Sequence, residues 1–317
     1  MRLVFSMIGK RITQLLIMFL LLSFITFVLM KLTPGDPVRT ILNVEDVSTT
    51  TAQEELIKQQ YGFDRPILIQ YGEWLSNVVQ LDLGESIIAK QPVLQLIINR
   101  LPASVALTIG GLVALLVIAV PFSVLAAIYE NKWPDYLCRG VAIIGASIPS
   151  FWLGLLLIFF FSLQLNLLPV MGRGTLAHYI LPSVTLGMAM APVYIKLLRE
   201  QLIDILQSSY IESAIARGIP RWRILLFHAI RGSLIPLVTM FGLSIGSLLG
   251  GITVIEMLFS WPGMGELIVN AVTQRDYPLI QGYIIVVGSL VVFINLLVDL
   301  ITMLINPQIM QEARRAQ

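Results

Sequence analysis

Long stretches of apolar residues alternate with shorter polar segments along the chain. A helix needs about 20 mostly apolar residues to cross the hydrocarbon core of a bilayer. Six stretches meet this requirement, at 12–30, 103–128, 141–163, 179–198, 234–259 and 283–304. The pattern therefore predicts an all-α, polytopic membrane protein with six transmembrane helices.

The first apolar stretch follows Arg2, Lys10 and Arg11, an arrangement that also occurs in secretory signal peptides. The stretch is long for such a peptide, and the segment 32–36 after it has no small-residue cleavage site. We therefore expect it to be retained as a transmembrane helix.

The composition excludes a water-soluble protein. Hydrophobic residues make up 56% of the 317 residues and charged residues 13%, and the mean hydropathy is +0.84. A soluble domain averages about 45–50% apolar and about 25% charged residues. The net charge of +2 gives no reason to expect nucleic acid as a partner, and the single cysteine, Cys138, excludes an internal disulfide.

The distribution of lysine and arginine predicts the orientation of the spans. Basic residues gather before the first span, in the segment 196–231 and at the end of the chain. Short cytoplasmic loops carry an excess of such residues, so both termini are predicted to be cytoplasmic. The predicted organisation is a first helix with an external loop region (1–100), a core of five transmembrane helices (101–306) and a cytoplasmic tail (307–317).

The external loop, 34–101, is long enough to contain structure of its own. Thr51 followed by Glu54 predicts a helix start, and Gly62 predicts its end. A second helix is predicted after Pro66, with an apolar face that includes Tyr71 and Trp74. Two interpretations stay open: a small cap packed on the spanning helices, and a surface that meets a delivery protein.

The internal loop, 200–232, also exceeds a simple connection. Ile211, Ala214 and Ile215 have the spacing of a helical apolar stripe. Gly218 is predicted to end that helix at the position after its cap, and Pro220 is predicted to open the next helix at its first position. The two short helices could lie against lipid headgroups, or they could protrude toward a partner.

The segment 212–218, with 234–236, resembles the EAA loop of binding-protein-dependent ABC importers, although Ser213 stands where alanine is common. Further segments resemble the peptide/nickel permease family along nearly the whole chain, and they are 33–37, 61–66, 82–86, 101–107, 147–152, 168–169, 180–182, 250–265 and 275–278. In that family the loop docks on the ATP-binding subunit. The resemblance thus implies a coupling role for Glu212, Ala214, Ala216, Arg217 and Gly218.

The resemblance implies an ABC importer type I permease fold in the bacterial cytoplasmic (inner) membrane. It also implies a second homologous permease in a heterodimer, two ATP-binding subunits and an external solute-binding protein. The chain has no phosphate-binding loop of the Gly-x-x-x-x-Gly-Lys-Ser/Thr type, so it is expected not to be an enzyme. ATP and Mg are expected on the partner subunits, with no cofactor in this chain.

The segments 164–182 and 275–281 resemble the nickel branch of the family more than the dipeptide branch, so nickel ion or a nickel chelate is the favoured cargo. Import of dipeptides or oligopeptides by the same mechanism is the alternative. An ATP-independent channel or secondary transporter is the alternative from another class. No metal site is expected, because His178 and His228 are predicted on opposite sides of the membrane.

Glu256 is the notable charged residue of the fifth span, because a charge in a membrane is costly and usually faces protein or water. Gly250 and Gly251 precede it by one to two turns and permit close helix packing. These three residues are a possible gate or pathway. The alternative is an ion pair between Glu256 and Arg275 or a loop lysine.

Overall fold

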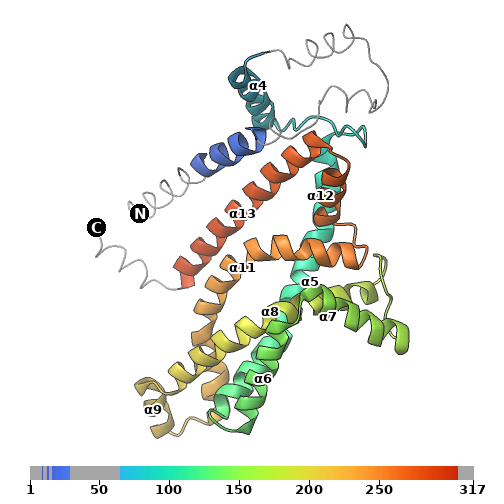
Figure 1. The fold of residues 1–317 in the computed structure, drawn as a ribbon. Helices are drawn as coiled ribbons and strands as arrows, with labels where there is room; N and C mark the ends of the chain where they lie inside the picture. The colour runs from blue at the N-terminus through green and yellow to red at the C-terminus, as the bar shows by residue number, and fades with distance from the viewer. Residues whose placement is uncertain (1–8, 10–12, 14–15, 29–64, 306–317) are drawn as a thin grey trace. The chain divides into compact units, whose positions relative to one another are not determined.

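A computed structural model describes residues 9, 13, 16–28 and 65–305 (Figure 1). In these ranges the elements are helical, with α-helices and two π-helical segments, η1 and η2. Their bounds are Leu16–Val28, α4 Ile67–Val79, α5 Val93–Ile128, α6 Trp133–Ser147, α7 Ser150–Leu157, η1 Ile158–Gln164, α8 Leu176–Leu206, α9 Ser209–Ala216, α10 Arg221–Ile224, η2 Leu225–Ala229, α11 Ile230–Leu258, α12 Met264–Thr273 and α13 Tyr277–Ile305.

Among the described residues, three helices are long and apolar enough to cross a membrane: α5, α8 and the part of α13 over Tyr277–Val298. α5 and α8 cover the predicted second and fourth spans, and this part of α13 covers 283–298 of the predicted sixth span. α11 covers the predicted fifth span, and Leu16–Val28 covers the described part of the first. The all-α membrane fold is confirmed, and the count of six transmembrane helices stays a prediction.

The predicted third span is not a straight helix. α6 begins at Trp133, well before the predicted start, and α7 with η1 continues after a bend of 104°. The bend lies at Ile148 and Pro149, where the backbone is extended (φ −89°, ψ 122° and φ −60°, ψ 137°). A residue before proline is disfavoured in the α region, which explains the break. If the bent pair forms one span, the number of candidate spans rises to four.

The chain divides into two compact units. Unit 1 comprises Met1–Leu101 and Leu267–Phe293, and unit 2 comprises Pro102–Glu266 and Ile294–Gln317. The first boundary between the units lies between Leu101 and Pro102, and the domain organisation with boundaries at 100/101 and 306/307 stays a prediction. The segment 267–293 belongs with unit 1, an association that the sequence prediction did not contain.

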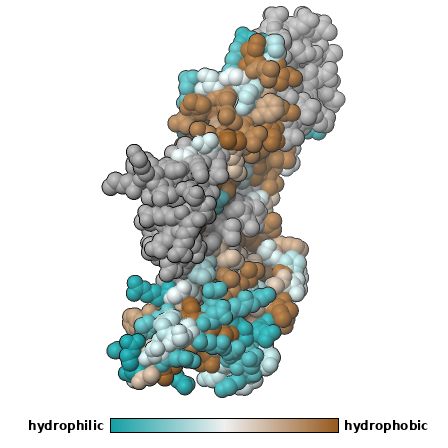
Figure 2. Space-filling model, turned by 90° about the vertical axis from the view of Figure 1, so that its left-hand side faces the viewer, coloured by the Kyte–Doolittle hydropathy of each residue, from teal (hydrophilic) through white to brown (hydrophobic). Residues whose placement is uncertain are grey.

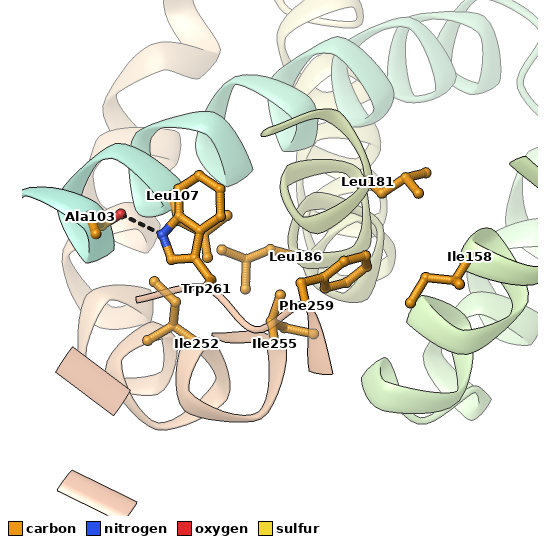
Figure 3. Close-up of a cluster of buried hydrophobic side chains, with 9 residues drawn as sticks. All are labelled: Ala103, Leu107, Ile158, Leu181, Leu186, Ile252, Ile255, Phe259 and Trp261. Carbon is orange, nitrogen blue, oxygen red and sulfur yellow. Dashed lines mark hydrogen bonds between the residues drawn. The ribbon is translucent and has the colours of Figure 1, made fainter. Parts of the chain in front are cut away.

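In unit 2, α5 and α8 approach each other closely at Gly187. A Cβ atom at Gly187 would lie 2.6 Å from the backbone nitrogen of Leu115 and 2.8 Å from the Cβ of Ala114. Only glycine therefore fits at this crossing, as in other helix contacts within membranes. A core of nine buried residues joins α5, η1, α8, α11 and the turn after α11, and Trp261 is one of them (Figure 3). The Trp261 indole Nε1–H donates to the Ala103 carbonyl oxygen at 3.0 Å.

Ser183 adds an uncompensated polar group to the α5–α8 contact. Its side chain is 7% exposed, and its hydroxyl has no hydrogen-bond partner among the described residues. Removing a buried hydroxyl that lacks a partner leaves nothing else unsatisfied. We expect Ser183→Ala to change the free energy of unfolding by less than about 0.5 kcal/mol, or to raise it by up to about 1 kcal/mol. Thermal unfolding of the purified complex would show this, and a fall of several degrees in the melting temperature would contradict it.

In unit 1, α4 confirms the helix predicted after Pro66. It packs on the helix Leu16–Val28 through aromatic rings, because Tyr71 lies 5.5 Å from both Phe24 and Phe27 between ring centroids. The predicted helix between Thr51 and Gly62 lies outside the described residues.

A buried carboxylate links a second part of the loop region that is predicted to be external to the start of α13. Asp276, 1% exposed, accepts hydrogen bonds from the Ser86 hydroxyl and from the backbone N–H groups of Ile87 and Ile88. It also accepts from the N–H of Leu279 in the first turn of α13, at 3.4 Å. The loop after α4 is therefore held by a side chain almost two hundred residues away in the sequence.

Candidate functional site

The segment that follows α8 forms the compact helical turn that the sequence predicts. α9 runs over Ser209–Ala216 and ends in a left-handed residue, Gly218, with φ +77°. The Gly218 N–H donates to the Ile215 carbonyl at 2.9 Å, and the Ile219 N–H donates to the Ala214 carbonyl at 3.2 Å. These two bonds form a Schellman motif, which satisfies carbonyls left open at the helix end. The prediction that Gly218 ends this helix is confirmed.

The two faces of α9 differ in what they contact. Ile211 and Ala214 are 1% and 3% exposed, and they pack against Ile224 of α10. Around them lie apolar side chains from the end of α8 and the turn after α9, which are Ile205, Leu206 and Ile219. Ala214 therefore acts as a packing residue that seats α9 on unit 2.

The opposite face of α9 is open. Glu212, Ala216, Arg217 and Gly218 are exposed, and a Cβ atom at Gly218 would meet nothing within 4 Å. The Arg217 side chain is held along the helix, because its Nε–H donates to the Ser213 carbonyl at 3.1 Å. Ile215, predicted to belong to the packed stripe, is 52% exposed on this side. Hydrophilic residues gather at this end of unit 2 in Figure 2. Four of the five predicted coupling residues therefore share one accessible surface.

Apolar packing connects α9 to the rest of unit 2. Ile205 and Leu206 contact the α9 cluster and also a second cluster formed by Ala127, Leu202 and Ala229. One turn further along α8, Leu198 belongs to a third cluster with residues of α5, α6 and α11. Close-packed interiors transmit displacement rather than absorb it. A push on α9 would therefore be carried along α8 through unit 2.

An ion pair fixes α6 to α8 beside this packing. Asp135 is fully buried at the start of α6, and its two carboxylate oxygens accept from Arg199 Nε and Nη2, both at 2.6 Å. The Asn131 N–H donates to the same carboxylate at 3.0 Å. Such a paired fork geometry is specific to arginine. No local sequence signal indicates this pair, because Asp135 and Arg199 are 64 positions apart.

Lysine at position 199 would keep the charge but lose one of the two parallel hydrogen bonds to Asp135. A hydrogen bond to a charged group contributes about 1.5–3 kcal/mol, so we expect Arg199→Lys to lower the free energy of unfolding by about 2 kcal/mol. The measurement is thermal unfolding of the purified complex. Arg221→Lys, at an exposed position of α10, is the matched control and should leave stability unchanged.

Glu256 lies near the end of α11 with its carboxylate turned into unit 2, where its side chain is 0% exposed. One oxygen accepts from the Ser104 hydroxyl. The other accepts from the N–H groups of Gly265 and Glu266, at 2.6 and 3.3 Å, in the first turn of α12. Ser104 in turn accepts from the Met264 N–H at 2.7 Å. In the described part of the chain, the groups bonded to this carboxylate are neutral donors rather than a cation.

This arrangement gives Glu256 a definite structural role. A helix N-terminus has unpaired N–H groups and a partial positive charge. A carboxylate accepts hydrogen bonds from those N–H groups, and its negative charge is attracted to the partial positive charge. A Cβ atom at Gly263 would overlap the Glu256 carboxylate, so any larger residue in the turn between α11 and α12 would have to displace that carboxylate. Gly250 and Gly251 lie within α11, and their surroundings are outside the described residues. The proposed gate formed by these three residues stays a prediction.

Comparison with known proteins places the chain in a family. Residues 119–311 match the family model for the binding-protein-dependent transport system inner membrane component, and residues 4–108 match the N-terminal model of the same membrane components. The glutathione transport system permease protein GsiC of Escherichia coli O6:H1 is 40% identical over 300 residues, which cover 95% of this chain and 97% of the relative. The protein of the same name from Shigella flexneri serotype 5b is 39% identical over the same shares.

A solved structure shows the same fold. The MetNI methionine ABC transporter, in an inward-facing conformation, has a chain that aligns with a TM-score of 0.57 at 19% identity, covering 67% of this chain and 97% of that chain. The membership in the importer permeases that the sequence motifs predicted is therefore confirmed. The chain belongs to the inner membrane permease subunits of binding-protein-dependent ABC importers, within the peptide/nickel family.

Proposed function

We propose that this chain forms half of the transmembrane pathway of an importer for a small peptide-like solute. The observation that carries the proposal is the 40% identity with a glutathione transport permease over 95% of the chain. The nickel preference inferred from the sequence has no support among these relatives, and import of short peptides fits them better. A thiol tripeptide or another short peptide is therefore the proposed cargo class.

The proposed transport cycle uses the open face of α9. An external solute-binding protein delivers the peptide, and ATP binding closes two partner ATP-binding subunits. Glu212, Ala216 and Arg217 would meet one of these subunits, and its movement would displace α9 together with the end of α8. Only a difference in contact between the two states of the partner can drive such a switch. ATP hydrolysis belongs to the partners, and a second, homologous permease would complete the pathway with both termini cytoplasmic.

The test uses the whole transporter reconstituted into liposomes with its binding protein. ATP hydrolysis and solute uptake are measured with glutathione, a dipeptide or a nickel chelate as the load. We expect a peptide load to stimulate hydrolysis several-fold and to be taken up, while the nickel chelate does neither. Stimulation by the nickel chelate alone would overturn the cargo proposal. Uptake that persists without any ATP-binding subunit would overturn the importer mechanism and favour a channel.

A further inference from the structure

One flank of α4 carries apolar side chains that remain open to the surroundings. Leu68 is 74% exposed and Val79 is 72% exposed, and Leu75 between them is half-buried. At 3.6 residues per turn, these three side chains lie about 40–80° around the helix from Tyr71. Gly72 lies on the same flank, and a Cβ atom there would meet nothing within 4 Å. This flank, formed by Leu68, Gly72, Leu75 and Val79, is called the α4 stripe.

The neighbouring flank of α4 is already occupied. Tyr71 and Trp74 pack on the helix Leu16–Val28, and the Tyr71 hydroxyl is hydrogen-bonded to the Ser23 hydroxyl at 2.9 Å. The apolar part of α4 is therefore wider than its contact with that helix. A helix whose apolar sector exceeds its packed sector needs a second apolar neighbour.

The third side of α4 is mainly polar, with the 50% exposed Ile69 as its apolar exception. Glu73 forms an exposed ion pair with Arg65, and the Gln80 side chain donates to the Ser76 hydroxyl at 3.3 Å. These side chains lie roughly opposite the packed flank, about 140–200° from Tyr71. α4 thus has a side suited to water, a side bonded to protein, and the α4 stripe between them.

Apolar surface continues beyond the end of α4. Leu81 is 69% exposed and has φ +64°, a conformation that bulky side chains rarely adopt. Together with Leu94 and Ile98 it lines an open pocket of about 290 Å³ in unit 1. The Asp82 carboxylate in this lining already accepts from the Gly84 N–H at 2.9 Å. Hydrophobic residues cover much of unit 1 in the face that Figure 2 presents.

We propose that α4 lies along the membrane–water interface, with the α4 stripe and Leu81 in contact with the acyl chains of a phospholipid. The helix Leu16–Val28 gives the direct reason, because it exposes apolar side chains along its length, among them Leu16, Ile17, Leu20, Leu21, Phe24 and Ile25. Phe24 is 42% exposed on that surface and also touches Tyr71 of α4. The α4 stripe is therefore next to an exposed apolar surface on a helix that is predicted to span the membrane.

The position and side chains of α4 fit an interfacial helix. Phe24 lies six residues before the end of the predicted first span, which is about 9 Å at 1.5 Å per residue. Interfacial helices bury their apolar face about 5–10 Å into the boundary between headgroups and acyl chains. Tyrosine and tryptophan are enriched at that depth. With a cytoplasmic N-terminus, the leaflet is the outer one.

A soluble delivery protein fits the α4 stripe less well. Interfaces that form and dissociate are about as polar as the rest of a protein surface. The stripe contains no charged or hydrogen-bonding side chain, whereas the polar groups of α4 lie on another side. The position of α4 at the interface does not depend on the identity of the cargo.

The test is spin labelling of single cysteines in the complete transporter, reconstituted into phospholipid bilayers. The background is Cys138→Ser, since Cys138 is the single cysteine of the chain. Leu68→Cys, Gly72→Cys and Val79→Cys report on the stripe, and Ser76→Cys and Gln80→Cys are the matched controls on the polar side. The collision rates of each label with oxygen, which concentrates in lipid, and with a water-soluble nickel chelate are compared.

At the three stripe positions, we expect the collision rate of the label with oxygen to exceed its collision rate with the nickel chelate several-fold. At the two control positions, we expect the collision rate with the nickel chelate to be the higher one. A higher collision rate with the nickel chelate than with oxygen at the stripe positions would show that the stripe lies in water, which would overturn the proposal. Low rates for both reagents would mean that protein covers the stripe, which also overturns it. So would immobilisation of the stripe labels when a loaded binding protein is added. Because these three positions are exposed, a label there does not disturb the packing of buried side chains. Three positions are used so that the test can still be made if one variant fails to assemble.

Discussion

Replacing Glu256 by alanine is expected to destabilise unit 2 strongly. The change leaves the N–H groups of Gly265 and Glu266 and the Ser104 hydroxyl without their buried acceptor. Each such loss costs about 1–3 kcal/mol, but removing the buried carboxylate also removes its own desolvation cost, so the free energy of unfolding should fall by about 3–5 kcal/mol. For a unit of this size, that corresponds to a melting temperature roughly 10 °C lower.

Two further variants separate a structural role of Glu256 from a gate. Glu256→Gln keeps the shape and one acceptor oxygen, so we expect a loss of only about 1–2 kcal/mol. Gly263→Ala keeps Glu256 but places a methyl group against its carboxylate, which should cost about 1–3 kcal/mol. Asp204→Ala, at an exposed position of α8, is the control and should melt like the wild type.

The outcomes of these variants are distinct. If Glu256→Ala melts within about 2 °C of the wild type, the hydrogen-bond network does not hold α12 as described. If Glu256→Gln melts normally but loses most of its solute uptake, the carboxylate has a function in the pathway that its burial does not reveal. Thermal unfolding and uptake therefore need to be measured on the same preparations.

Local signals in the sequence predicted the helices that surround the candidate sites. Pro66 and the spacing of apolar residues after it gave α4, and Gly218 with the stripe at Ile211 and Ala214 gave α9. These signals work because turn and cap preferences act over a few residues. The break at Pro149 was open to the same reasoning, since proline restricts the residue before it. The break was not predicted because the residues on both sides of it, within 141–163, are apolar and read as one continuous span.

The partners of buried charges could not be predicted in this way. Glu256 meets Ser104 across 152 positions of sequence, and Asp135 meets Arg199 across 64. A single sequence indicates that a charge in an apolar helix needs a partner, but it does not say which group provides it. For Glu256 the sequence suggested a cation, whereas the fold supplies neutral donors and a helix N-terminus. The expectation that a charge in an apolar helix has a partner was correct. The identity of that partner depends on how helices that are distant in the sequence pack together.

Replacing Gly218 by valine is expected to reduce solute uptake about tenfold while leaving membrane insertion intact. Gly218 has φ +77°, and a side chain in that region costs about 1–2 kcal/mol for most residues, with β-branched residues the least tolerant. The Schellman bonds at Gly218 and Ile219 would open in part of the molecules. A change of about 1.4 kcal/mol corresponds to a factor of ten, so coupling to the ATP-binding subunits should fall by that order.

The matched control is Gly218→Asn, because asparagine tolerates a positive φ. A Cβ atom at this position meets nothing within 4 Å in this chain, so any steric effect would have to come from a partner. If backbone conformation is what matters, Gly218→Asn keeps uptake within about twofold of the wild type and Gly218→Val does not. If both variants lose uptake and no longer retain the ATP-binding subunits on purification, the partner subunit packs directly on Gly218. Normal uptake by Gly218→Val would refute the assignment of α9 as the coupling element, because the turn that sets its exposed face would then be dispensable.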